Sequence, residues 1–136
     1  MAMEKDRITC HVLDTTAGRP AKGIAVRLVG PSTSQTFSSE TEPSDSQAEH
    51  SYSATTDADG RIKLWKPLGM SSELSGVLAG VQGASRWTLH FDTEGYFGEG
   101  NTFFPEATIV FRVEQGQTYH VPLLLSPFTY TTYRGS

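Results

Sequence analysis

Residues 119–125, with the sequence Tyr-His-Val-Pro-Leu-Leu-Leu, decide the fold of this chain. Every second position is apolar, which is the two-residue period of a β-strand that buries one face. The buried row is expected to be Tyr119, Val121, Leu123 and Leu125, and the opposite row His120, Pro122 and Leu124. The residues that follow, 126–136, contain a proline, three aromatic residues and the sequence Tyr-Arg-Gly-Ser. Chain ends are usually polar and frayed, so this composition predicts a tail that packs against something.

The rest of the chain has the same β character. Short runs of alternating or β-branched residues are separated by turn sequences such as Asp57-Ala58-Asp59-Gly60. Strands are predicted at 7–14, 24–29, 51–56, 61–66, 86–92, 107–114 and 118–125. Many short strands without a long helical period predict an all-β sandwich or barrel. One short helix is expected at 93–98, capped by Asp92 or Thr93, with a weaker helical segment at 73–79.

Length and composition favour one domain that spans residues 1–136. Two long connections, 31–50 and 67–85, are predicted as loop insertions within it, the first rich in Ser, Thr and Glu and therefore solvated. Insertions in surface loops cost little free energy, so they are not expected to change the fold.

Charge and cysteine content narrow the class of protein. A formal net charge of -4 argues against nucleic-acid binding, and no apolar run approaches the roughly 20 residues of a membrane span. Cys10 has no cysteine partner within the chain, and residues 1–7 lack the apolar segment of a secretory signal. We therefore expect a cytoplasmic protein; a peroxisomal location stays open although the sequence has no final Ser-Lys-Leu.

Strand alternation places three polar side chains away from the core. In the first strand Ile8, Cys10 and Val12 form the buried row, which puts His11 on the other face with Thr9 and Leu13. After the turn at 57–60, Ile62 and Leu64 are predicted inward and Arg61, Lys63 and Trp65 outward. His11, Arg61 and His120 thus share outward faces with apolar residues. An outer face of this kind is usually hidden in an oligomer.

Each of these residues also has an ordinary structural interpretation. A single histidine on a strand face is by default a solvated polar residue, and His50 and His90 keep that interpretation. Asp57 and Asp59 fit a turn better than a calcium loop, because the remaining EF-hand spacing is missing. His11 and His120 have no His, Cys or Glu residue close to them in sequence at the spacing of zinc ligands. The Gly-x-Ser-x-Gly sequence of a nucleophile elbow is also absent. Composition and spacing alone therefore indicate an oligomeric β-sandwich.

Several blocks of sequence resemble one known family. They are Thr9–Asp14 with Gly18–Ala21, Thr56–Arg61, Phe91–Thr93 with Tyr96–Phe97, Phe104–Glu106, and His120–Pro127 leading into Tyr133–Ser136. In this order they are similar to the transthyretin-related family, specifically to the 5-hydroxyisourate hydrolases. The resemblance covers nearly the whole chain apart from the first residues and the two long connections.

The resemblance implies a transthyretin-like, two-sheet antiparallel β-sandwich with one short helix, assembled as a homotetramer, a dimer of dimers with active sites between the dimers. The implied catalytic residues are His11, Arg61, His120 and Ser136. The implied substrate-binding residues are His11, Arg61, Tyr133 and Arg134. No metal and no organic cofactor is implied.

The implied reaction is hydrolysis of 5-hydroxyisourate to 2-oxo-4-hydroxy-4-carboxy-5-ureidoimidazoline in urate catabolism. A histidine pair can activate water and protonate the departing nitrogen, and an arginine can stabilise the oxyanion. His120 is favoured as the base and His11 as its partner or the acid, with the reverse order still open. The alternative is a transthyretin-like carrier that binds a small ligand in the channel between dimers, since one fold serves several functions.

Overall fold

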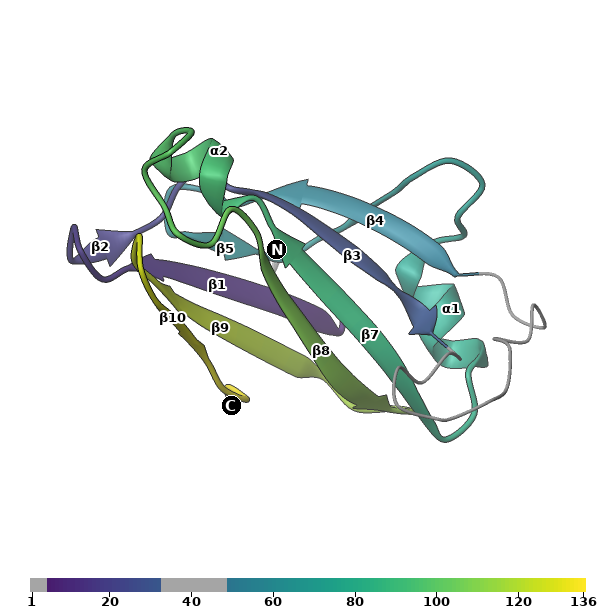
Figure 1. Ribbon diagram of the computed structural model, residues 1–136. Coiled ribbons are helices and arrows are strands. Elements are labelled where there is room, and N and C mark those ends of the chain that lie inside the picture. The colour runs from purple at the N-terminus through teal and green to yellow at the C-terminus, as the bar shows by residue number, and fades with distance from the viewer. Residues whose placement is uncertain (1–4, 33–48) are drawn as a thin grey trace, which may run out of the picture.

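Two β-sheets pack face to face in the computed structural model, which describes residues 5–32 and 49–136 (Figure 1). The first sheet has the order β10-β9-β1-β2, with β5 also paired to β1, and the second sheet has the order β6-β4-β3-β7-β8. The first sheet contains β1 (Ile8–Asp14), β2 (Arg19–Pro20), β5 (Arg61–Ile62), β9 (Tyr119–Leu125) and β10 (Tyr130–Thr132). The second contains β3 (Ala25–Ser32), β4 (His50–Thr55), β6 (Lys66–Pro67), β7 (Ala84–Phe91) and β8 (Ala107–Glu114). The predicted two-sheet sandwich is confirmed.

The centre of the first sheet is the pairing of β1 with β9. These two strands run parallel, from Ile8 opposite Tyr119 to Asp14 opposite Leu125, whereas the other strand pairs are antiparallel. Both predicted apolar rows are buried: Ile8, Cys10 and Val12 from β1, and Tyr119, Val121, Leu123 and Leu125 from β9. They join Trp87, Leu89 and Phe91 of β7 in one core. The same alternation sends the odd positions of β1 and the even positions of β9 outward.

The predicted strand at 61–66 is wrong. The chain leaves the first sheet after Ile62 and joins the second sheet at Lys66, so the two-residue alternation does not continue between them. Leu64, predicted to be buried, is 53% exposed, and Trp65, predicted outward, is only 7% exposed. The indole N–H of Trp65 donates to the Ile8 carbonyl at 2.8 Å, and this hydrogen bond holds the ring inward where the chain passes from the first sheet to the second.

The structure contains two short helices in its described part rather than the single helix expected, and they lie at opposite ends of the sandwich (Figure 1). Helix α2 (Thr93–Phe97) begins as predicted, because the carboxylate of Asp92 accepts the Gly95 N–H at 2.9 Å. Helix α1 (Leu74–Gly80) lies in the connection 67–85, where only a weak helical segment was predicted, and it buries Leu74 and Leu78. Neither helix is long and apolar enough to cross a membrane. Of the other predicted loop, 31–50, residues 33–48 lie outside the described part of the chain.

A buried carboxylate ties β1 to α2. Asp14 is only 6% exposed, and one of its oxygens accepts the N–H groups of Thr16 and Ala17 at 3.0 and 2.9 Å. Its other oxygen accepts the hydroxyl of Tyr96 at 2.8 Å. A buried charge of this kind is stable only when it is hydrogen-bonded, so the Tyr96 hydroxyl compensates for part of its desolvation.

We expect Tyr96→Phe to lower the free energy of unfolding by about 1–3 kcal/mol, because it leaves one oxygen of Asp14 without its donor. Urea unfolding followed by tryptophan fluorescence measures the change. Tyr130→Phe is the control, since the Tyr130 hydroxyl makes no hydrogen bond with the described residues. Equal stabilities for Tyr96→Phe and the control would contradict this role of the Asp14–Tyr96 pair.

Candidate active site

The outward face of the first sheet brings His11, Arg61 and His120 together. Arg61 lies opposite His11 in the pairing of β1 with β5, and His120 lies opposite Thr9 in the pairing of β1 with β9. The rings of His11 and His120 are 6.2 Å apart between centroids and tilted by 35°. Three of the four predicted catalytic side chains therefore share one face although they are far apart in sequence.

The ring of His120 is held on both edges. Its Nδ1 lies 2.8 Å from the hydroxyl oxygen of Thr9. On the other edge, Gly135 of the tail donates its N–H to the His120 carbonyl at 2.8 Å, and a Cβ at position 135 would lie 2.8 Å from the ring carbon Cδ2. The remaining ring nitrogen, Nε2, is the one left for a ligand. Thr9 and Gly135 were not predicted as site residues, because their contacts depend on strand register and on the course of the tail.

The surroundings of His120 keep it neutral. Burial is the largest cause that lowers its pKa, followed by the charges of His11, Arg61 and Lys5. Desolvation and nearby positive charge both disfavour the imidazolium. A neutral imidazole near physiological pH can accept a proton, as a general base must.

Arg61 is positioned by the turn that precedes it. The carboxylate of Asp57 accepts the backbone N–H groups of Asp59 and Arg61 at 2.9 and 3.0 Å, and the hydrogen bond from Arg61 is the largest cause of the lowered pKa of Asp57. Asp57 is thus a turn residue, as predicted. The guanidinium of Arg61 makes no ion pair with a carboxylate in the described part of the chain, so it is available to an anionic or oxygen-rich ligand.

The tail runs along the free edge of β9 and ends beside His120. Strand β10 pairs with β9 from Tyr130 opposite Leu125 to Thr132 opposite Leu123, and the Thr132 hydroxyl donates to the Pro122 carbonyl at 2.8 Å. Pro122 lies on the outward face but is buried beneath this segment. The predicted packed tail is therefore present, and its backbone forms one edge of the site.

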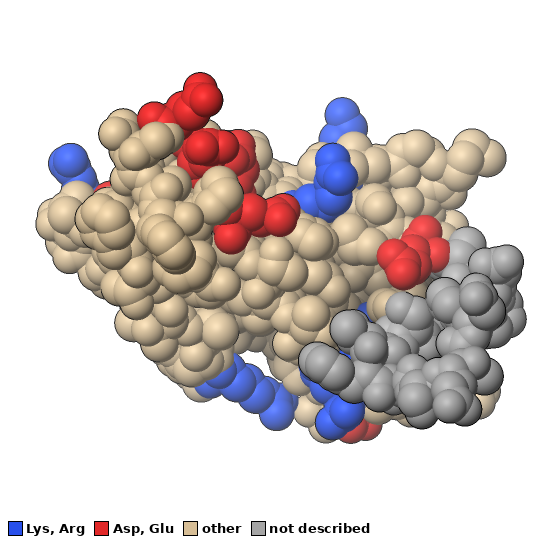
Figure 2. All heavy atoms as spheres, viewed as in Figure 1, with Lys and Arg blue, Asp and Glu red and all other residues tan. Residues whose placement is uncertain are grey.

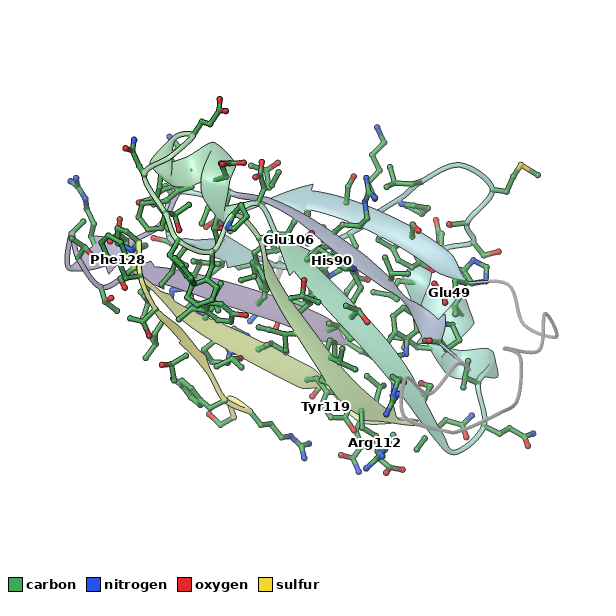
Figure 3. The ribbon with its side chains drawn as sticks, in the orientation of Figure 1. Glu49, His90, Glu106, Arg112, Tyr119 and Phe128 are labelled. Carbon is green, nitrogen blue, oxygen red and sulfur yellow. The ribbon has the colours of Figure 1, made fainter. Side chains whose placement is uncertain are left out.

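The predicted tail residues differ in their surroundings. Tyr133 is 56% exposed, and Ser136 is exposed. The guanidinium of Arg134 lies 4.7 Å above the Tyr119 ring and donates to the Gln117 side chain at 3.3 Å. Tyr119 lies at the same edge of the molecule as the tail (Figure 3). The structure thus brings Gly135 into contact with His120, whereas the Arg134 guanidinium contacts Tyr119 and Gln117.

The site is open in a single chain. A hollow of about 370 Å³ lies between β8 and the tail and is lined by His120, Tyr133 and Arg134, but not by His11 or Arg61. A larger hollow of about 1160 Å³ near α1 includes none of these residues. Acidic side chains gather around α2 (Figure 2), and one acidic residue, Glu114, lines the hollow that contains His120. The charged groups that lower the pKa of His120 are His11, Arg61 and Lys5, which suits a ligand that carries or develops negative charge.

The other two histidines lie elsewhere. His50 Nδ1 accepts the Ser72 N–H at 3.1 Å at the start of β4. His90 lies on the outer face of the second sheet with Glu106, 3.3 Å away (Figure 3). Both have local partners apart from the site, in keeping with the structural interpretation. The described residues contain no group of three His, Cys, Asp or Glu side chains suited to a metal ion.

Two face-to-face sheets with a histidine pair and an arginine on one outer face define a β-sandwich protein with a site suited to acid–base chemistry. Residues 8–135 match the HIUase/Transthyretin family, and the chain belongs to that family. It is 37% identical to the 5-hydroxyisourate hydrolase of Mus musculus over 100% of both chains. It is 36% identical to the probable 5-hydroxyisourate hydrolase of Schizosaccharomyces pombe, over 95% of this chain and 90% of that protein.

A solved structure, that of Klebsiella pneumoniae 5-hydroxyisourate hydrolase, has a TM-score of 0.58 and 26% identity, and the match covers 95% of this chain and 98% of that one. Together these similarities confirm the resemblance that the sequence blocks indicated. They also confirm the prediction that the chain is an enzyme.

We expect Gly135→Ala to displace the His120 ring while the protein stays folded. The added Cβ would lie 2.8 Å from Cδ2, which is closer than such atoms approach, so the ring must shift away from Gly135 and its contact with Thr9 must change. The measurement is the change in the His120 ring resonances in NMR spectra of histidine-labelled protein. Gly76→Ala is the matched control, because a Cβ at position 76 meets no atom within 4 Å. Unchanged His120 resonances in Gly135→Ala would show that the tail does not hold the ring.

Proposed function

We propose that this protein hydrolyses 5-hydroxyisourate and opens its six-membered ring to give 2-oxo-4-hydroxy-4-carboxy-5-ureidoimidazoline, a step of urate degradation. The observation that carries the proposal is the convergence of His11, Arg61 and His120 on one face of a chain that belongs to this family. The curated relatives named above, which bear the name of this hydrolase, support the choice of substrate.

The reaction needs three things from the site. A water molecule must lose a proton as its oxygen bonds to the ring carbonyl carbon, the oxyanion that forms must be stabilised, and the departing nitrogen must gain a proton as the C–N bond breaks. Imidazoles titrate near neutral pH and suit both proton transfers. A guanidinium stays charged throughout and suits the oxyanion.

In the proposed reaction His120 takes the proton from water. Its lowered pKa keeps the ring neutral, and Nε2 is the nitrogen that Thr9 leaves free. His11, with its ring centroid 6.2 Å away, donates the proton to the departing nitrogen. Arg61, opposite His11 in the sheet, stabilises the oxyanion.

The tail completes the proposed substrate pocket. We assign the exposed Tyr133 to the substrate ring, and Ser136 to orienting water or a histidine, as the resemblance implies. Arg134 would have to leave the Tyr119 ring to contact substrate directly. In its observed position it fixes the course of the tail next to Gly135.

The proposed enzyme is a homotetramer, a dimer of dimers. The support is the open face itself: His11 and His120 are only half-buried, and the apolar Leu13 and Leu124 lie on the same face. Hydrolytic sites exclude bulk water so that electrostatic interactions with the reacting atoms are strong. A second dimer that covers the outward face of the first sheet would supply the missing wall.

We also propose a cytoplasmic location for the enzyme. A carrier on the same fold is the alternative function. The carrier hypothesis gives no role to a neutral histidine held next to a second histidine and an arginine. It also predicts binding without turnover, which an activity measurement separates from hydrolysis.

We expect the protein to accelerate the decay of 5-hydroxyisourate generated in situ from urate by urate oxidase, with an optically active product. His11→Ala, His120→Ala and deletion of residues 134–136 should each lower kcat by about 10²-fold or more, because each removes a group assigned to proton transfer or to the pocket. Spectrophotometric decay and circular dichroism measure rate and stereochemistry.

His90→Ala is the control for the histidine variants, since His90 lies on the other sheet with Glu106. It should keep the full rate. Sedimentation should show one and the same tetramer for the wild type and all variants. A wild-type protein that leaves the rate of spontaneous decay unchanged would contradict the hydrolase proposal. A monomer with full activity would contradict the proposed tetramer.

The pH dependence of kcat/KM is expected to have its acidic limb below 6.5, the ordinary pKa of a histidine, because the base must be neutral and its pKa is lowered in the folded protein. The charges that lower the pKa of His120 belong to His11, Arg61 and Lys5, and Arg112, Glu114 and Arg134 line the hollow beside it. Lys5→Gln removes one positive charge, so the limb should move toward higher pH without loss of the maximal rate. An acidic limb above 6.5 in the wild type would contradict the assignment of His120 as the base.

A further inference from the structure

We propose that Thr9 is a positioning residue that places the proton of neutral His120 on Nδ1 and so presents an unprotonated Nε2 to the reacting water. The inference rests on the proposed function for its catalytic meaning. The position of the proton, however, is a property of the free protein and can be measured without substrate.

The first step of the argument is the contact itself. Parallel pairing of β1 with β9 sets Thr9 directly beside His120, and the hydroxyl oxygen lies 2.8 Å from Nδ1. This is a normal hydrogen-bond distance between two half-buried side chains. The contact spans 111 positions of the sequence, so it exists only because the two strands are neighbours.

The second step is the orientation of the ring. Gly135 lies against Cδ2, on the edge of the imidazole opposite Thr9. A ring turned over by half a rotation would bring Cδ2 to the Thr9 hydroxyl and move Nδ1 toward Gly135. That orientation gives up the only side-chain hydrogen bond that the ring makes with the described residues. The tail and Thr9 therefore select the same orientation.

The third step is the location of the protons. A threonine hydroxyl carries one hydrogen and can also accept. The Thr9 hydroxyl has a second neighbour, the Tyr119 carbonyl oxygen at 3.4 Å, toward which it can donate. Its oxygen is then free to accept the Nδ1–H of His120, which leaves the lone pair on Nε2.

The number of hydrogen-bond donors favours this arrangement over the reverse one. In the reverse arrangement Thr9 donates its single hydrogen to Nδ1, and the ring hydrogen sits on Nε2. The Tyr119 carbonyl oxygen then loses the Thr9 hydroxyl as a donor. With the ring hydrogen on Nδ1, Thr9 accepts from the ring and can still donate to that carbonyl. The proton therefore belongs on the Thr9 side of the ring.

The second sheet offers a matched comparison. Thr108 lies beside His90 with its hydroxyl 3.5 Å from Nδ1, but that nitrogen is also 3.3 Å from a carboxylate oxygen of Glu106. The pair has the same two residue types without the close contact, and His90 lies apart from the site. Thr108→Val thus removes a threonine hydroxyl from a histidine without touching the proposed machinery.

The experiment compares the wild type with Thr9→Val, Thr9→Ser and Thr108→Val. The ¹⁵N shifts of the His120 ring nitrogens, recorded without substrate at a pH above the His120 pKa, report which nitrogen carries the proton. In the wild type we expect protonated Nδ1. Thr9→Val, which keeps the shape and loses the hydroxyl, should shift the population toward protonated Nε2 and lower kcat about 10- to 100-fold with little change in KM. Thr9→Ser should restore both, and Thr108→Val should change neither.

Protonated Nε2 in the wild type would overturn the proposal, and this result does not depend on the folding of any variant. Wild-type ring shifts in Thr9→Val would overturn it as well. So would a Thr9→Ser protein that behaves like Thr9→Val, since packing would then be the cause. If the wild type has protonated Nδ1 but leaves 5-hydroxyisourate unchanged, the proposed function fails and the assignment of the proton to Nδ1 stands.

Discussion

The parallel pairing of β1 with β9 is the constraint on which the rest of the structure depends. It joins residues about 110 positions apart and builds the first sheet around them. The register of this pairing decides which side chains are buried, because a shift by one residue would turn His120 into the core and Val121 out of it. The same register that buries the apolar rows therefore places Thr9, His11 and His120 on one face. Core packing and site geometry are in this sense one requirement.

The other edge of β9 is used by the tail. Without β10 that edge would expose unpaired backbone groups, which invite contact with other chains. Past Thr132, the tail makes one more hydrogen bond to β9, from the Gly135 N–H to the His120 carbonyl. The tail therefore covers the edge of β9 and also restricts the position of the His120 imidazole. Glycine is required at this point by space rather than by backbone angle, since a Cβ would strike the imidazole. The composition of the tail follows from what it lies against.

The sequence predicted those parts of the fold in which a strand runs without interruption. The rows of β1 and β9 were correct because the two-residue period holds along both strands. The strand prediction was wrong from Arg61 to Lys66, because the chain passes there from one sheet to the other and Trp65 turns inward to reach the Ile8 carbonyl. Helix α1 gave only a weak signal, since seven residues without a side-chain cap owe their stability to the burial of Leu74 and Leu78. The roles of Thr9 and Gly135 depend on contacts across the sheet and could not be predicted from local pattern.

The charges around His120 suit a reaction in which negative charge develops. Burial and the neighbouring positive groups keep the free imidazole neutral, which makes it available but also a weak base. In the proposed reaction an oxyanion near Arg61 would offset the guanidinium charge that opposes protonation of the ring. The proton affinity of His120 would then rise during the step in which it receives the proton, while Thr9, as we propose, still accepts the hydrogen on Nδ1. The proposed arrangement thereby stabilises the transition state more than the ground state, which is the condition for lowering the barrier.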